Sequence, residues 1–145
     1  MILGLTGGIA SGKSFVADLF VECGASLVSA DLLAREVVNQ GSPTLAKLVD
    51  AFGVEILTAG GSLNREVLAQ KVFSDPLARH RLELITHPAI AHLAECRLLA
   101  LKNSPHDLIV YEAPLLFEAG AESRVDQVLV VVIDPALQLE RLLTR

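Results

Sequence analysis

A glycine-rich segment near the N-terminus constrains this chain more than any other feature. Residues 7–14 read Gly-Gly-Ile-Ala-Ser-Gly-Lys-Ser and match the pattern G-x-x-x-x-G-K-[ST]. An apolar run over residues 2–6 precedes the match, and apolar residues at helical spacing follow it as far as Gly24. Strand, glycine-rich loop and helix in this order are typical of a loop that wraps phosphate groups. We therefore predict a strand, a phosphate-binding P-loop and a helix over residues 2–24.

The residue types in this loop explain how it would bind ATP. Gly7 and Gly12 allow backbone angles that side chains disfavour, so successive amides can turn inward around phosphate oxygens. Lys13 would bring a positive charge to the β- and γ-phosphates, and Ser14 would give a hydroxyl ligand to Mg²⁺. The predicted nucleotide-binding residues are Gly8, Ile9, Ala10, Ser11, Gly12, Lys13, Ser14 and Phe15. The alternative is a glycine-rich turn that binds no ligand.

The rest of the chain alternates apolar runs with helical patterns. Further strands are expected over residues 26–29, 108–111 and 125–133, and a last helix is expected from about Pro135. Short apolar runs of this kind suit parallel strands that helices cover on both faces. The pattern predicts an α/β fold in three layers, with a parallel sheet flanked by helices.

A long stretch between the second and third predicted strands is entirely helical in pattern. It covers residues 43–103 and is expected to be a substrate-binding insertion. Asn64 is a plausible N-cap for one of its helices. The pair His87-Pro88 is expected to interrupt the last helix, because the residue before a proline avoids the helical region.

Composition limits the class of protein. A length of 145 residues suits one domain, and a formal net charge of −5 without a basic stripe argues against broad nucleic-acid binding. No apolar run approaches the roughly 18 residues of a membrane helix, and the first residues do not read as a signal peptide, so we expect a cytoplasmic protein. Cys23 and Cys96 fall on the apolar side of helical patterns and are expected to be buried thiols.

The loop motif by itself does not separate a kinase from a GTPase or an ATP-driven machine. The chain has no Asn-Lys-x-Asp segment of the kind that reads guanine. A long insertion between the second and third strands favours a small-molecule kinase, in which it would carry the acceptor site.

Several further motifs, in order along the whole chain, resemble the dephospho-CoA kinase family. They lie at residues 4–14, 30–35, 60–65, 72–73, 82–88, 114–118 and 138–145. They resemble, in turn, its form of the P-loop, A-D-x-x-A-R, G-G-x-L-[DN]-R, V-F, L-E-x-I-T-H-P, P-L-L-F-E and Q-x-x-R-L-x-x-R. The resemblance implies one P-loop kinase domain over residues 1–145, with the start of a lid at about 138–145.

The activity that this resemblance implies is transfer of the γ-phosphate of ATP, with Mg²⁺, to the ribose 3′-hydroxyl of dephospho-CoA, the last step of coenzyme A synthesis. The catalytic residues would be Lys13, Asp31 and Arg141, with Asp31 accepting the proton of the hydroxyl. An N-cap role for Asp31 is the alternative. Asp31, Arg35, Arg65, His87, Pro114 and Leu115 would bind the substrate. A monomer or a small homo-oligomer is expected.

The lid would bring Arg141 and Arg145 over ATP, where guanidinium groups can stabilise the transferring phosphoryl group. An ordinary charged helix face is the alternative for these two arginines. Glu112, at the end of the third predicted strand, would lie near Mg²⁺ or pair with a cation.

The chain departs from the family pattern at three points. Ala10 stands where glycine is usual, and Phe15 replaces a threonine whose hydroxyl could reach the α-phosphate. The chain stops at Arg145 where family members continue, so we expect a chain truncated at its C-terminus. The alternative functions are another small-molecule or nucleoside-monophosphate kinase, or a fragment that binds ATP without catalysis.

Overall fold

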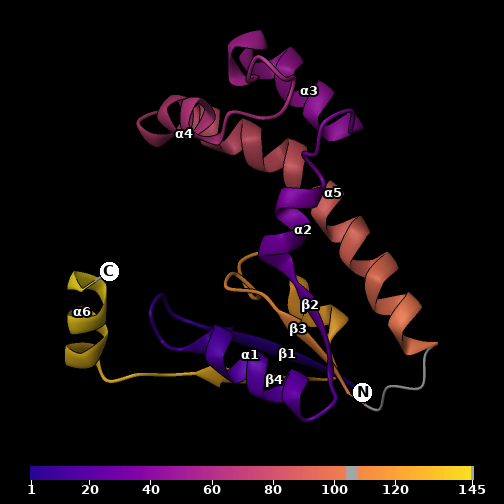
Figure 1. Cartoon of the computed structure of the whole chain (residues 1–145), viewed down its shortest axis with the longest axis vertical. Helices are drawn as coiled ribbons and strands as arrows, with labels where there is room; N and C mark the ends of the chain where they lie inside the picture. The colour runs from indigo at the N-terminus through magenta and orange to yellow at the C-terminus, as the bar shows by residue number, and fades with distance from the viewer. Residues whose placement is uncertain (104–107, 145) are drawn as a thin grey trace. The chain divides into compact units, whose positions relative to one another are not determined.

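The computed structural model describes residues 1–103 and 108–144 and divides the chain into two compact units (Figure 1). The first unit comprises Met1–Ala30 with Ala94–Arg145, and the second comprises Asp31–Leu93. None of the described helices combines the length and the apolar character needed to cross a membrane.

The first unit is built on a parallel sheet of four strands in the order β2-β3-β1-β4. The strands are β1 (Ile2–Gly7), β2 (Ser26–Ser29), β3 (Ile109–Glu112) and β4 (Gln127–Val131). β1 lies between β3 and β4, with Leu5 paired to Glu112 on one side and to Leu129 on the other. The loop that follows β1 therefore begins in the interior of the sheet's carboxyl edge, where ligands bind in open α/β sheets. The predicted α/β fold is confirmed.

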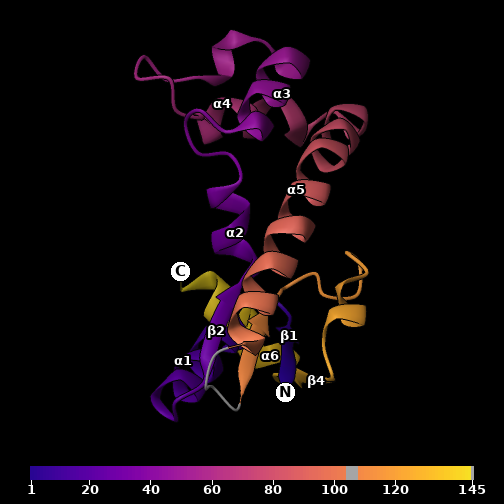
Figure 2. The same cartoon turned by 90° about the vertical axis from the view of Figure 1, so that its right-hand side faces the viewer.

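Side chains of neighbouring β1 residues face opposite sides of the sheet. Leu5 packs with Ala17 of α1 (Lys13–Glu22) and with Val110, in an apolar cluster under that helix. A Cβ at Gly4 would instead lie 3.0 Å from Val125 and 3.1 Å from Leu116. The connection from β3 to β4, which includes η2 (Ala121–Arg124), therefore covers the face opposite α1, as Figure 2 shows.

The strand expected over residues 125–133 is present but shorter, and the general expectation that helices cover the strands on both faces is wrong for β4. β4 spans Gln127–Val131 rather than 125–133, and Val128, Leu129 and Val130 are 37%, 37% and 49% exposed. The reason is its position at one end of the described sheet, where it pairs only with β1. An apolar run indicates a strand but does not reveal its place in the strand order.

Both cysteines are exposed, contrary to the sequence prediction. Cys23 is the C-cap of α1, and the buried residue of that helix is Ala17. Cys96 lies in α5 (Pro76–Lys102), whose buried residues are Ala94 and Leu98. In both helices fewer residues are buried than the apolar pattern of the sequence suggests.

The second unit is helical and has its own core. It contains α3 (Pro43–Phe52), η1 (Val54–Ile56), α4 (Arg65–Phe73), most of α2 (Ala30–Glu36) and the first part of α5. Its buried cluster consists of Val37, Val38, Leu48, Ile56 and Leu68. Asn64 caps α4 as predicted, with its Oδ1 accepting a hydrogen bond of 3.2 Å from the Val67 amide. The sequence prediction of an insertion over residues 43–103 that holds a substrate remains a prediction.

Helix α5 continues through Pro88, so the predicted interruption at His87-Pro88 is wrong. A proline inside a helix removes one backbone hydrogen bond and costs about 3 kcal/mol. Leu82 and Ile85 before it, and Ala89 and Ile90 after it, pack against the same buried cluster. This packing on both sides of Pro88 offsets the cost and keeps the helix continuous.

The chain's only tyrosine, Tyr111 of β3, is 3% exposed, and we expect it to make the stability of the fold depend on pH in the alkaline range. Burial raises the pKa of the Tyr111 hydroxyl, and the charge of Arg124 opposes this in part. The folded chain thus holds this proton more tightly than the unfolded chain, whose tyrosine pKa is about 10. The stability from the neutral hydroxyl is present below that pKa and is lost as the pH rises toward the folded pKa.

We therefore expect the ultraviolet absorbance of the phenolate to appear at a higher pH in the folded chain than in the chain unfolded by denaturant. Tyr111→Phe should remove this contribution to the alkaline fall in the free energy of unfolding. Superimposable titrations of the folded and unfolded chains would contradict the prediction.

Candidate active site

The P-loop occupies the turn between β1 and α1. The Ser11 amide donates to the Gly8 carbonyl at 3.2 Å, and Gly12 caps the start of α1 with a φ of 95°. This backbone conformation is strained for any residue with a Cβ, so glycine is required there. Ala10 also has a positive φ, of 60°, although it carries a Cβ.

Gly7, the last residue of β1, is tightly packed. A Cβ at Gly7 would lie 2.6 Å from the Val131 carbonyl oxygen and 2.9 Å from Ser11 Oγ. Ser11 is 8% exposed, and its hydroxyl has no hydrogen-bond partner among the described residues. A buried hydroxyl of this kind, inside the loop, is available to a polar ligand.

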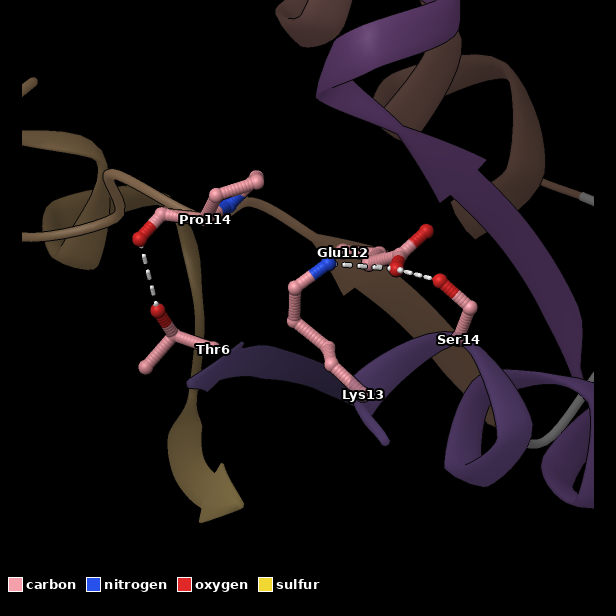
Figure 3. Close-up of polar contacts among 5 residues, drawn as sticks. All are labelled: Thr6, Lys13, Ser14, Glu112 and Pro114. Carbon is pink, nitrogen blue, oxygen red and sulfur yellow. Dashed lines mark hydrogen bonds and ion pairs between the residues drawn. The ribbon is translucent and has the colours of Figure 1, made fainter. Parts of the chain in front are cut away.

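Lys13, Ser14 and Glu112 meet at the end of the loop (Figure 3). Lys13 Nζ donates to Glu112 Oε1 at 2.6 Å, and Ser14 Oγ donates to the same oxygen at 3.3 Å. The Lys13 and Glu112 side chains are only 11% and 10% exposed, so the ion pair is shielded from water. The predictions for Glu112 left a magnesium role and a cation partner open, and the structure shows the cation partner.

Glu112 reaches Lys13 because β3 and β1 are adjacent parallel strands in register, with Glu112 paired to Leu5. The two side chains come from positions 99 residues apart. Their pairing fixes the direction of the lysine at the carboxyl edge of the sheet. No local sequence signal links them.

Thr6 connects β1 to the segment after β3 and was missed by the sequence analysis. Its Oγ1 donates to the Pro114 carbonyl at 3.2 Å, as Figure 3 also shows. Pro114 and Leu115, both predicted to bind substrate, are exposed and directly follow this part of the sheet. The sequence feature that could have indicated Thr6 is its position as a polar residue near the end of a buried apolar strand.

Helix α6 (Pro135–Leu143) contributes two side chains to the loop. Arg141, a predicted catalytic residue, donates through a guanidinium nitrogen to the Ala10 carbonyl at 3.3 Å. Gln138 donates to the Ile9 carbonyl at 2.7 Å, a contact that the sequence analysis did not predict. Arg145 lies outside the described residues.

The remaining predicted residues belong to the helical unit, where all four are exposed: Asp31, Arg35, Arg65 and His87. Asp31 and Arg35 lie one turn apart on α2, which begins at Ala30. Asp31 is thus inside the first turn and is not the N-cap, contrary to the alternative considered for it. A carboxylate in a first helical turn is favoured by the helix dipole.

The types of donor atom at the site suit phosphate groups and a metal ion that binds with them. In residues 1–103 and 108–144, no three His, Cys, Asp or Glu side chains are grouped to hold a metal ion by themselves. Ser14 Oγ and the Glu112 carboxylate, 3.3 Å apart, are oxygen donors of the kind Mg²⁺ prefers. In such sites Mg²⁺ is held by one or two protein oxygens together with substrate phosphates. The donors present therefore fit Mg²⁺ that arrives with a nucleotide.

Comparison with known proteins gives a consistent result. The profile of the family described as dephospho-CoA kinase matches residues 1–145. The dephospho-CoA kinase of Syntrophotalea carbinolica is 57% identical over all of this chain and 69% of its own length. That of Geobacter metallireducens is 50% identical over all of this chain and 72% of its own length.

Solved structures are similar over the same extent. A Thermus thermophilus protein of known structure has a TM-score of 0.78 and 34% identity, over 100% of this chain and 72% of its own. The dephospho-CoA kinase of Campylobacter jejuni has a TM-score of 0.76 and 28% identity, over 99% of this chain and 72% of its own.

Proposed function

The chain belongs to the dephospho-CoA kinase family, and we propose that it transfers the γ-phosphate of ATP to the ribose 3′-hydroxyl of dephospho-CoA. The products are coenzyme A and ADP. The observation that carries the proposal is the meeting of Lys13, Ser14 and Glu112 at the end of a P-loop. Phosphoryl transfer depends mainly on positioning and charge neutralisation, and this group of side chains provides for both.

The loop binds the phosphates of ATP. Its backbone amides and the N-terminus of α1 favour negative charge, and Lys13 adds a full positive charge. Glu112 holds the ammonium group at the end of the loop, so less side-chain freedom is lost when the phosphates bind.

Ser14 Oγ would hold Mg²⁺, and the Glu112 carboxylate, which accepts from Ser14 Oγ at 3.3 Å, would orient that hydroxyl. When bound, the ion neutralises charge on the β- and γ-phosphates. Phe15 has no side-chain hydroxyl that could bind the α-phosphate. At this position only the backbone amide can donate a hydrogen bond to it.

The acceptor residues are proposed from the family motifs that they match. Asp31 orients the 3′-hydroxyl and accepts its proton as the oxygen attacks phosphorus and the bond to the ADP oxygen breaks. Dephospho-CoA is held by Arg35, Arg65, His87, Pro114 and Leu115. Arg141, already at the loop, stabilises the charge of the transferring group. A cytoplasmic location and a monomeric or small homo-oligomeric state remain predictions.

A coupled assay of ADP release tests this function. The purified chain is given ATP and Mg²⁺, with dephospho-CoA, with a nucleoside monophosphate, or with no acceptor. We expect release that depends on dephospho-CoA and a product that carries a new phosphate on the 3′-oxygen. Release with the nucleoside monophosphate and none with dephospho-CoA would assign the chain to the alternative acceptor class.

A further inference from the structure

Two side chains of α6 hold the backbone of the P-loop, and we propose that this contact orients the amides that bind the nucleotide phosphates. Gln138 Nε2 donates to the Ile9 carbonyl at 2.7 Å, and Arg141 donates to the Ala10 carbonyl at 3.3 Å. We call these two contacts the α6 clasp. Gln138 is then a positioning residue for nucleotide binding, an inference that rests on the proposed function for the identity of the ligand.

The local structure of α6 places both side chains toward the loop. Asp134 caps the helix, its Oδ1 accepting from the Ala136 amide at 2.9 Å, and Pro135 is its first residue. Gln138 and Arg141 are three residues apart and so share one face of the helix. α6 follows β4, whose Val131 pairs with Gly7 at the start of the loop. The pairing of β4 with β1 thus places the start of α6 close to the P-loop.

The clasp acts on the direction of the loop amides. In a trans peptide the C=O and N–H bonds of one plane point in opposite directions. The Ile9 carbonyl shares its plane with the Ala10 amide, and the Ala10 carbonyl shares its plane with the Ser11 amide. Holding both carbonyls toward α6 turns both amides away from it. The Ser11 amide donates to the Gly8 carbonyl and closes the turn of the loop, while the Ala10 amide is turned away from α6 in the same sense. Successive amides turned into a loop form an anion-binding site.

Ala10 makes the loop depend on this support. Within residues 1–103 and 108–144 it is the only non-glycine residue with a positive φ. A residue with a Cβ is disfavoured in that conformation, whereas glycine adopts it freely. If the clasp were removed, Ala10 would be free to relax toward a negative φ, and this rotation would turn the adjacent peptide planes.

The first test removes the donor without changing the length of the side chain. In the full chain, Gln138→Met should weaken the binding of Mg²⁺–ADP about three- to tenfold by calorimetry, the effect of one hydrogen bond. Gln127→Met, at the exposed first residue of β4, is the matched control and should leave the affinity unchanged. Equal affinity in Gln138→Met and the unsubstituted chain would overturn the proposal.

The second test distinguishes a contact that orients the loop amides from one that only attaches α6 to the loop. Ala10→Gly removes the strain, so adding Gln138→Met to that variant should weaken ADP binding by less than about twofold. A merely structural contact would give the same loss in both backgrounds, and that outcome would overturn the proposal. Amide hydrogen exchange gives a readout without nucleotide: Gln138→Met should speed exchange at Ala10 and Ser11, and unchanged exchange would count against the clasp.

These results are distinguishable from a failure of the proposed function. ADP binding and amide exchange require no acceptor. A chain that loses ADP affinity on Gln138→Met but never phosphorylates dephospho-CoA would support the clasp and contradict the reaction. If Gln138→Met leaves both phosphate transfer and ADP affinity unchanged, the reaction is supported and the clasp is contradicted.

Discussion

Lys13→Ala is expected to reduce phosphoryl transfer from ATP to dephospho-CoA by at least about 10²-fold. Removing one preorganised hydrogen-bond donor from a developing negative charge already costs about 10²–10³ in kcat. Lys13 carries a full charge and is held at the loop by Glu112 through a contact of 2.6 Å. ADP release in the coupled assay measures the effect. Activity near that of the unsubstituted chain would contradict the P-loop assignment.

The same substitution also leaves the Glu112 carboxylate without its cation. Breaking a buried ion pair by removing one partner costs up to about 3–5 kcal/mol, so lower activity could reflect unfolding. The double variant Lys13→Ala with Glu112→Gln removes the uncompensated charge. We expect it to recover much of the free energy of unfolding, measured in denaturant, while transfer stays lost.

A second ion pair provides a matched control in the helical unit. Lys71 Nζ lies 2.7 Å from Glu55 Oε1, but these side chains are 34% and 57% exposed. Exposed pairs contribute about 0.2–1 kcal/mol, so Lys71→Ala should change stability little and leave transfer intact. The contrast between the two lysines would show that the loss belongs to the loop and not to ion pairs in general.

Features encoded in short segments could be predicted from the sequence. The strand, loop and helix around Gly12 follow from glycine spacing and apolar periodicity, and the cap at Asn64 follows from residue type. The parallel sheet follows from the alternation of strands and helices. Each of these predictions uses local patterns and their order along the chain, without knowledge of which distant residues are in contact.

Features that depend on distant residues could not be predicted in this way. The exposure of β4 depends on strand order, and the continuity of α5 through Pro88 depends on packing against other helices. The Gln138 contact joins residues 129 positions apart and takes effect through a backbone carbonyl, which has no sequence signature. The family motif around Gln138 predicts a lid over ATP, which stays a prediction, and it gave no indication of the contact with the loop.

The other large effect is expected at Asp31, the first residue of the helical unit. Asp31→Asn should lower kcat for dephospho-CoA by about 10²–10⁴-fold, the contribution of a general base. An amide keeps the size and hydrogen-bonding reach of the carboxylate but cannot accept the proton of the 3′-hydroxyl. Affinity for Mg²⁺–ATP, measured by calorimetry, should stay the same, because the loop over residues 7–14 is untouched.

Asp50→Asn is the matched control, since Asp50 is an exposed carboxylate on α3 of the same unit. It should leave kcat and ATP affinity unchanged. Neutralising Asp31 also removes a charge from the first turn of α2, which costs about 0.3–1 kcal/mol, too little to unfold the unit. A loss of ATP affinity or a large loss of stability in Asp31→Asn, with normal turnover of the protein that remains folded, would make Asp31 a structural residue. Loss of turnover alone, with ATP affinity and stability kept, would support Asp31 as the general base that accepts the proton of the 3′-hydroxyl.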